Sequence, residues 1–145
     1  MAAIETRYSI TGATALTILN RVFEQANADG KAIFVAVVDG TGALVGLLAH
    51  EKVPAICRQI CQDKAFTAYA TRMKTSIWKA YVYSTPQEER DLMLRQPGYI
   101  AASGGIPIVI DGVVAGAVGV SGAGQQEDED LAELGAAIAM AAAAA

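Results

Sequence analysis

The stretch SGGIPIVIDGVVAGAVGVSG, residues 103–122, decides the fold. Two apolar runs, 106–110 and 113–120, flank the pair Asp111-Gly112. An Asp-Gly pair between apolar runs is a strong signal for a β-hairpin, because both residues tolerate the positive φ angles of a tight turn. A glycine within a strand allows a second backbone or a ligand to approach closely, and Gly116 and Gly119 lie within the second run. The stretch therefore predicts a central hairpin whose glycine-rich end is a candidate pocket wall.

A further hairpin is predicted for residues 32–50, AIFVAVVDGTGALVGLLAH. Its first half is rich in β-branched residues, and the turn signal Asp39-Gly40-Thr41-Gly42 separates it from a second apolar half. Both strands are apolar at nearly every position, which is typical of strands that are covered on both faces. We expect the covering layers to be helices of this chain or another subunit.

Helices are predicted before, between and after the two hairpins. Apolar residues recur at three- and four-residue steps after Thr11, a candidate N-cap, and Pro54 can begin a helix at its first position without losing a hydrogen bond. The expected helices cover residues 11–28, 54–71, 75–83, 86–94 and 125 onward. Two hairpins separated by helices predict an α+β domain, with a mainly antiparallel sheet of four or five strands and helices packed on it. A single domain over residues 1–145 is expected.

Composition limits the classes of partner. The chain has 53% hydrophobic and 18% charged residues and a net charge of -4, so it can form a core but lacks the basic excess typical of nucleic-acid binding. No apolar run approaches the roughly 18 residues that span a bilayer. Glu5 lies where a secretory signal would be apolar, so we expect a soluble, cytoplasmic protein without a membrane partner. A small domain with uncovered apolar faces usually assembles, which predicts a homo-oligomer.

Lys64 is the first candidate functional residue. On the predicted helix 54–71 it shares one face with Cys57, Cys61 and Ala68, where a charged amine is unusual. One interpretation is a side chain whose stem is buried while its amine reaches water. The other is an amine that lines a pocket, where it holds a carboxylate or acts in acid/base or Schiff-base chemistry.

His50 is the single histidine of the chain and follows the second strand of the first hairpin. One histidine disfavours a zinc site, which needs three or four protein ligands. It is compatible with haem, for which one axial ligand is sufficient. A hydrogen-bonded surface histidine is the alternative interpretation.

Four segments together resemble the GlcG/HbpS family, also called the haem-degrading-domain family, to which the C-terminal domain of PduO cobalamin adenosyltransferases is related. They are AVVDGTGALVGLLAH, DKAFTA around Lys64, the hairpin 103–122, and QQEDEDLAELG. The resemblance implies a profilin-like α/β/α sandwich with an antiparallel sheet of about five strands, and assembly into dimers or rings. It further implies binding of haem in some members and an accessory role in glycolate, glycerol or diol utilisation in others.

Two hypotheses for the function follow, with a third that needs no ligand. In the first, the protein binds haem or a related tetrapyrrole, with His50 as axial ligand and Lys64 pairing a propionate. In the second, it is a small enzyme acting on a small carboxylate or hydroxy compound, with Lys64 as acid/base or anion-holding group and the backbones of Gly104-Gly105 and Ser121-Gly122 as donors. The third is a structural accessory protein.

Overall fold

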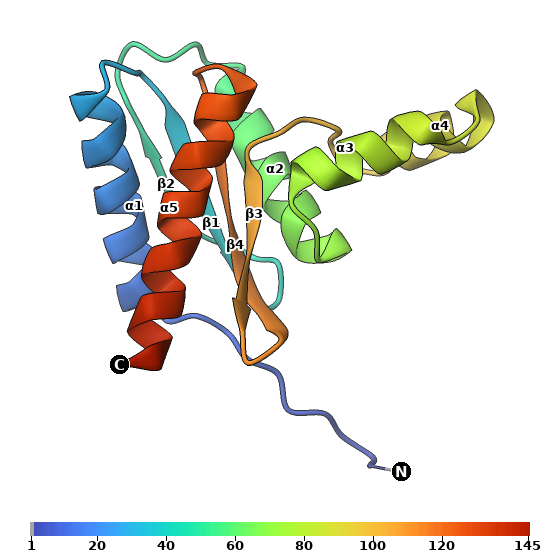
Figure 1. The fold of residues 1–145 in the computed structure, drawn as a ribbon, viewed down its shortest axis with the longest axis horizontal. Helices are drawn as coiled ribbons and strands as arrows, with labels where there is room; N and C mark the ends of the chain where they lie inside the picture. The colour runs from blue at the N-terminus through green and yellow to red at the C-terminus, as the bar shows by residue number, and fades with distance from the viewer. Residues whose placement is uncertain (1) are drawn as a thin grey trace.

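The computed structural model describes residues 2–145, which form one antiparallel sheet with helices on both faces (Figure 1). The predicted order of helices and strands is confirmed. In chain order the elements are α1 (Gly12–Ala28), β1 (Phe34–Asp39), β2 (Leu44–Ala49), α2 (Cys57–Thr71), α3 (Thr75–Ser84), α4 (Gln87–Leu94), β3 (Gly105–Ile110), β4 (Val113–Ser121) and α5 (Gln125–Ala144). The Thr11 hydroxyl accepts a hydrogen bond from the Thr14 N–H, as expected of an N-cap.

Within residues 2–145 the sheet has four strands, in the order β2-β1-β4-β3. The two predicted hairpins lie side by side because β1 pairs with β4, with Val37 opposite Val118. We expected about five strands, and the count is one lower. Residues 113–121 form one continuous strand because the glycines in this segment pair with both neighbouring strands. Gly119, for example, lies opposite Ala36 of β1 and opposite Gly105 of β3.

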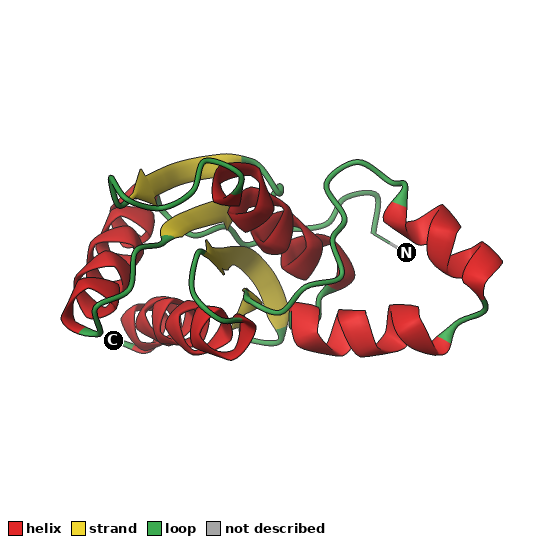
Figure 2. Ribbon diagram, turned by 90° about the horizontal axis from the view of Figure 1, so that it is seen from above, coloured by secondary structure: helices red, strands yellow, loops and turns green. Residues whose placement is uncertain are grey.

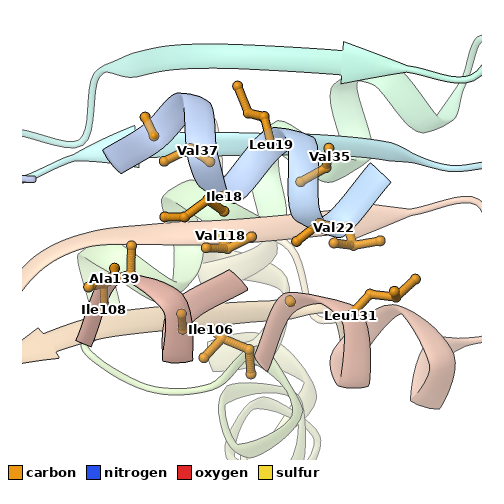
Figure 3. Close-up of a cluster of buried hydrophobic side chains, with 14 of the residues drawn as sticks. Ile18, Leu19, Val22, Val35, Val37, Ile106, Ile108, Val118, Leu131 and Ala139 are labelled. Carbon is orange, nitrogen blue, oxygen red and sulfur yellow. The ribbon is translucent and has the colours of Figure 1, made fainter. Parts of the chain in front are cut away.

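The sheet is the middle layer of an α/β/α sandwich, as expected. Helices α1 and α5 cover one face and α2 covers the other (Figure 2). Between the first two helices and the sheet lies the larger hydrophobic core (Figure 3), in which Ile18 and Val22 of α1 and Leu131 of α5 pack with Val35 and Val118. Burial of these side chains from water holds the three layers together.

On the other face of the sheet, the close packing of α2 requires glycine at two positions. A Cβ atom at Gly119 would overlap the carbonyl oxygen of Cys61, and one at Gly105 would overlap the carbonyl oxygen of Lys64. Helix α2 therefore rests with its backbone against β3 and β4, at a distance that only strands without side chains at these positions allow. The predicted close approach of a second backbone to Gly119 is confirmed, and that backbone is α2.

Two expectations need correction. Strand β1 is buried on both faces, but Leu44 and Val45 of β2 are exposed, because β2 is an edge strand and α2 packs over β1, β3 and β4 instead. Helix α2 begins at Cys57 and not at Pro54, since the Cys57 N–H donates to the Pro54 carbonyl in a preceding tight turn. Helices α3 and α4 extend away from the sandwich (Figure 1). None of the helices in the described part of the chain is long and apolar enough to cross a membrane.

Candidate functional site

Most of the predicted site residues lie at one end of the sheet, which we call the Ser121 end. Here β4 finishes at Ser121 opposite Phe34, the first residue of β1, and β3 begins at Gly105. His50 lies at the same end, immediately after β2. The two turns 39–42 and 111–112 lie at the opposite end, which we call the hairpin end.

The Lys64 amine is buried inside the sandwich. Its Nζ donates to the carbonyl oxygen of Val120 at 2.9 Å and to Oδ2 of Asp128 at 3.1 Å. The side chains of Lys64 and Asp128 are each only 3% exposed. The interpretation in which the amine reaches water is therefore wrong. Two of its three N–H donors are used by the protein itself.

The Lys64–Asp128 pair joins the two outer layers of the sandwich. Lys64 comes from α2 on one face of the sheet, and Asp128 from the first turn of α5 on the other. Gly104 makes room for this crossing, because a Cβ atom there would lie 2.9 Å from Lys64 Nζ and 2.7 Å from the Val120 oxygen. Glycine also suits the backbone at this position, where φ is +127°.

Asp128 is held on two sides. Its Oδ1 accepts a hydrogen bond from the Ala123 N–H at 3.0 Å, and its Oδ2 accepts the bond from Lys64. Burial raises the pKa of Asp128 above its usual value, while the charge of Lys64 and both hydrogen bonds act in the opposite direction. The sequence contains Asp128 in the acidic start of a helix, a position that the helix dipole explains on its own. Nothing in that pattern shows that one of those acids is buried.

One of the predicted backbone donors, the Gly105 N–H, is engaged within the protein. The Gly105 N–H donates to the Thr75 hydroxyl at 2.9 Å, and the Gly104 carbonyl accepts from the Val120 N–H. Ser121 is buried, and Gly122 packs so closely on the Ala32 carbonyl oxygen that a Cβ atom would lie 2.6 Å from it. Sequence reasoning missed Thr75, whose position as the first residue of a predicted helix gave no sign of this contact.

His50 lies apart from this cluster. Its Nδ1 accepts a hydrogen bond from the Lys52 N–H at 3.0 Å, its Nε2 is 3.6 Å from Glu51 Oε1, and the side chain is 21% exposed. The Phe23 ring of α1 lies 6.3 Å away, centroid to centroid. Strands β1 and β4 separate β2 from β3, so His50 and Gly104 are about 14 Å apart across the sheet at the usual strand spacing.

The larger of two described cavities, about 700 Å³, lies at the hairpin end. It is lined by the N-terminal segment 5–7, Gly40 of the β1–β2 turn, the end of α2 and the β3–β4 hairpin. A smaller one of about 320 Å³ lies between β2 and α2 and is lined by residues such as Leu44, Gln59 and Phe66. Neither includes Lys64, His50 or the predicted glycine donors. Among residues 2–145, no three His, Cys, Asp or Glu side chains are grouped to hold a metal ion.

Comparison with known proteins places these features in a family. Residues 10–137 match the family model described as "Haem degrading protein HbpS-like". Protein GlcG of Escherichia coli K12 is 30% identical over 118 residues, which cover 81% of this chain and 85% of GlcG.

Solved structures share the fold. Klebsiella pneumoniae protein ORFY superposes with a TM-score of 0.88 at 25% identity, covering 95% of each chain. A double mutant of Streptomyces reticuli HbpS gives a TM-score of 0.84 at 27% identity, covering 95% of this chain and 92% of its own. A PduOC–haem complex gives 0.80 at 21% identity over 90% of this chain and 94% of its own, a likeness of fold alone.

Proposed function

The chain belongs to the HbpS-like family, and on this premise we propose that it binds haem or a related tetrapyrrole. Family membership is the observation that carries the proposal. An accessory role in glycolate, glycerol or diol utilisation is part of the same proposal and rests on the resemblance alone.

His50 is the proposed axial ligand. It is the single histidine of the chain, its side chain is partly exposed, and the Phe23 ring beside it offers an apolar contact for a flat ligand. A bound haem would supply an iron centre for redox or gas-binding chemistry. The protein's part is to present the imidazole and to shield it from water on one side.

The hydrogen bond at Nδ1 sets a condition for ligation. Because Nδ1 accepts from the Lys52 N–H, the neutral ring carries its proton on Nε2. Ligation through Nε2 requires this proton to move to Nδ1 or to leave, and in the first case the Lys52 hydrogen bond is lost. We therefore expect haem binding to rearrange the turn between His50 and Val53, whose N–H donates to the His50 carbonyl.

The exposure of the two lysine side chains indicates which of them would contact a haem propionate. The predicted pairing with Lys64 requires the buried Lys64–Asp128 pair to separate. Lys52 is exposed two residues from His50, so it needs no such change to meet a carboxylate. We propose Lys52 as the first propionate partner.

Hemin titration of the purified protein tests this function. We expect a saturable shift of the Soret band, and we expect His50→Ala to change its position or abolish it. Glu51→Gln is the matched control: it removes the charge next to Nε2 and should leave the Soret band in place. No saturable shift, or an identical one in His50→Ala, would contradict the proposal.

The enzyme hypothesis stays a prediction. It needs a substrate next to Lys64, and there the amine and the Gly105 N–H are already bonded within the protein. Catalysis would require the Lys64–Asp128 pair to open.

We also propose that the chain forms a homo-oligomer. Apolar side chains are exposed on the edge strand β2, at Leu44 and Val45, and on the projecting helix α3, at Ile77 and Tyr81. Such surfaces usually mark contacts between proteins. Light scattering coupled to gel filtration measures the mass directly, and a monomer at micromolar concentration would contradict this part.

A further inference from the structure

The cavity at the hairpin end combines positive charge with an apolar wall, in a chain whose net charge is -4. Arg7 and Arg72 both line it, and Glu5 is the one acid among its lining residues. Both arginines are exposed and can reorient toward a ligand. Arg7 meets Glu5 only through a 3.4 Å contact between exposed side chains, and the Arg72 side chain makes no hydrogen bond or ion pair with any residue from 2 to 145. The lining therefore carries an excess of one positive charge.

Arg72 occupies a strained position. It follows α2 as its C-cap with φ of 60° and ψ of 24°, a left-handed conformation that glycine or asparagine adopts most easily at the end of a helix. Within residues 2–145 one other non-glycine residue has positive φ, Asp111 of the β3–β4 turn. A left-handed arginine has a conformational cost that glycine would avoid, and such strain is common in segments that hold ligands.

Apolar and aromatic side chains line other parts of the cavity. Val109 and Val113 of the β3–β4 hairpin both line the cavity and are exposed to solvent. Tyr69 adds an aromatic ring and a hydroxyl, and its ring is fixed against the turn at Gly42, where a Cβ atom would lie 2.8 Å from it. A cavity of about 700 Å³ is in the range of small-molecule sites and is far larger than an inorganic anion needs.

We propose that this cavity binds an organic anion, with its acid group on Arg7 and Arg72 and its apolar body on the valines and Tyr69. The guanidinium group suits a carboxylate because it donates two parallel hydrogen bonds. The site lies at the opposite end of the sheet from His50, so it is separate from the proposed haem contact and does not depend on it.

Benzoate is the probe, because it joins one carboxylate to a flat apolar body; benzamide has the same shape without the charge. NMR or calorimetric titration of the full chain should show saturable benzoate binding and much weaker benzamide binding. Inorganic phosphate should bind more weakly than benzoate. Equal binding of benzamide, or phosphate binding as tight as that of benzoate, would overturn the proposal.

Arg72→Gly is the decisive variant. Glycine favours the left-handed backbone, so the fold is retained while the guanidinium is lost. We expect about a tenfold or greater loss of benzoate affinity, the effect of one charge-assisted hydrogen bond, and a similar loss in Arg7→Gln. Glu5→Gln should tighten binding because it removes the opposing charge.

Arg21→Gln, on the exposed face of α1, and His50→Ala are the controls and should bind benzoate like the unmodified protein. A matching loss in Arg21→Gln would show a nonspecific charge effect and overturn the proposal. So would unchanged affinity in Arg72→Gly and Arg7→Gln.

Discussion

Lys64 Nζ lies 3.1 Å from Asp128 Oδ2, with both side chains buried and on helices from opposite faces of the sheet. Breaking a buried ion pair by removing one partner leaves an uncompensated charge in the interior and typically costs about 3–5 kcal/mol. We expect Lys64→Met and Asp128→Asn each to lower the free energy of unfolding by about 3 kcal/mol or more.

The double variant Lys64→Met with Asp128→Asn, which combines the two single substitutions, gives the contrast. It removes both charges together, so we expect it to be more stable than Lys64→Met alone. Urea unfolding of the four proteins gives the coupling energy between the two positions. Strictly additive losses would contradict a direct interaction.

Carboxylate-induced thermal stabilisation distinguishes two binding sites for a carboxylate. One is Lys64, as the enzyme hypothesis requires, and the other is the cavity at the hairpin end. If the carboxylate binds at Lys64, the double variant without both charges should lose the stabilisation and Arg72→Gly should keep it. If the carboxylate binds at Arg7 and Arg72, the reverse result is expected. Stabilisation that persists in the double variant would refute the role of Lys64.

Gly119 tests the close packing of α2. Alanine at this position would drive its methyl group into the backbone of Cys61 and Ala65, which cannot move without lifting the helix. We expect Gly119→Ala to destabilise the protein by about 3 kcal/mol, at the upper end of overpacking effects. Gly12→Ala, where a Cβ atom meets nothing within 4 Å, is the control and should be neutral in thermal unfolding.

Acid sensitivity is expected from the turn between β1 and β2. The carboxylate of Asp39 accepts hydrogen bonds from the Thr41 hydroxyl and N–H, which hold the pKa of Asp39 below its ordinary value. A lowered pKa in the folded state means that this stabilisation is present above the unfolded pKa of 3.8 and is lost as the pH falls through the folded value. Stability measured from pH 5 to pH 2 should therefore fall less steeply in Asp39→Asn. An identical dependence of stability on pH in the two proteins would show that protonation of Asp39 does not destabilise the turn.

The two cysteines should differ in reactivity. Burial raises the pKa of Cys61 to about 12, and its thiol donates to the Arg58 carbonyl, whereas Cys57 is half-buried. Thiolate is the reactive form, so maleimide should label Cys57 first. Mass spectrometry should find this fast labelling lost in Cys57→Ser and kept in Cys61→Ser; fast labelling of Cys61 would indicate that α2 opens readily.

Local signals were sufficient for most of the fold. The pair Asp111-Gly112 determines a hairpin through backbone conformation alone, and the N-cap at Thr11 and the breaks at proline are equally local. The resemblance implied about five strands and the sheet has four, one of the two counts that the residues allowed. The glycines of β4 do not interrupt the strand, and Gly119 is where α2 approaches it. The exposure of β2 depends on which strands α2 covers, and the sequence pattern of β2 itself does not show this.

The candidate site was less predictable. Apolar periodicity correctly showed that Lys64 is on a buried helix face, but it could not show its partner, which lies 64 residues away in sequence. Asp128 stands among four consecutive acids, and a single sequence does not reveal which of them turns inward. The cavity at the hairpin end is lined by four segments remote in sequence, so it was missed altogether.

The crossing at Gly104 has a consequence for motion. The salt bridge between Lys64 and Asp128 connects α2 to α5 across the sheet. Neither helix can therefore move outward without leaving an unpaired charge in the apolar interior. Amide hydrogen exchange should accordingly show α2 and the first turns of α5 opening as a single cooperative unit, while the projecting α3–α4 arm exchanges independently and much faster.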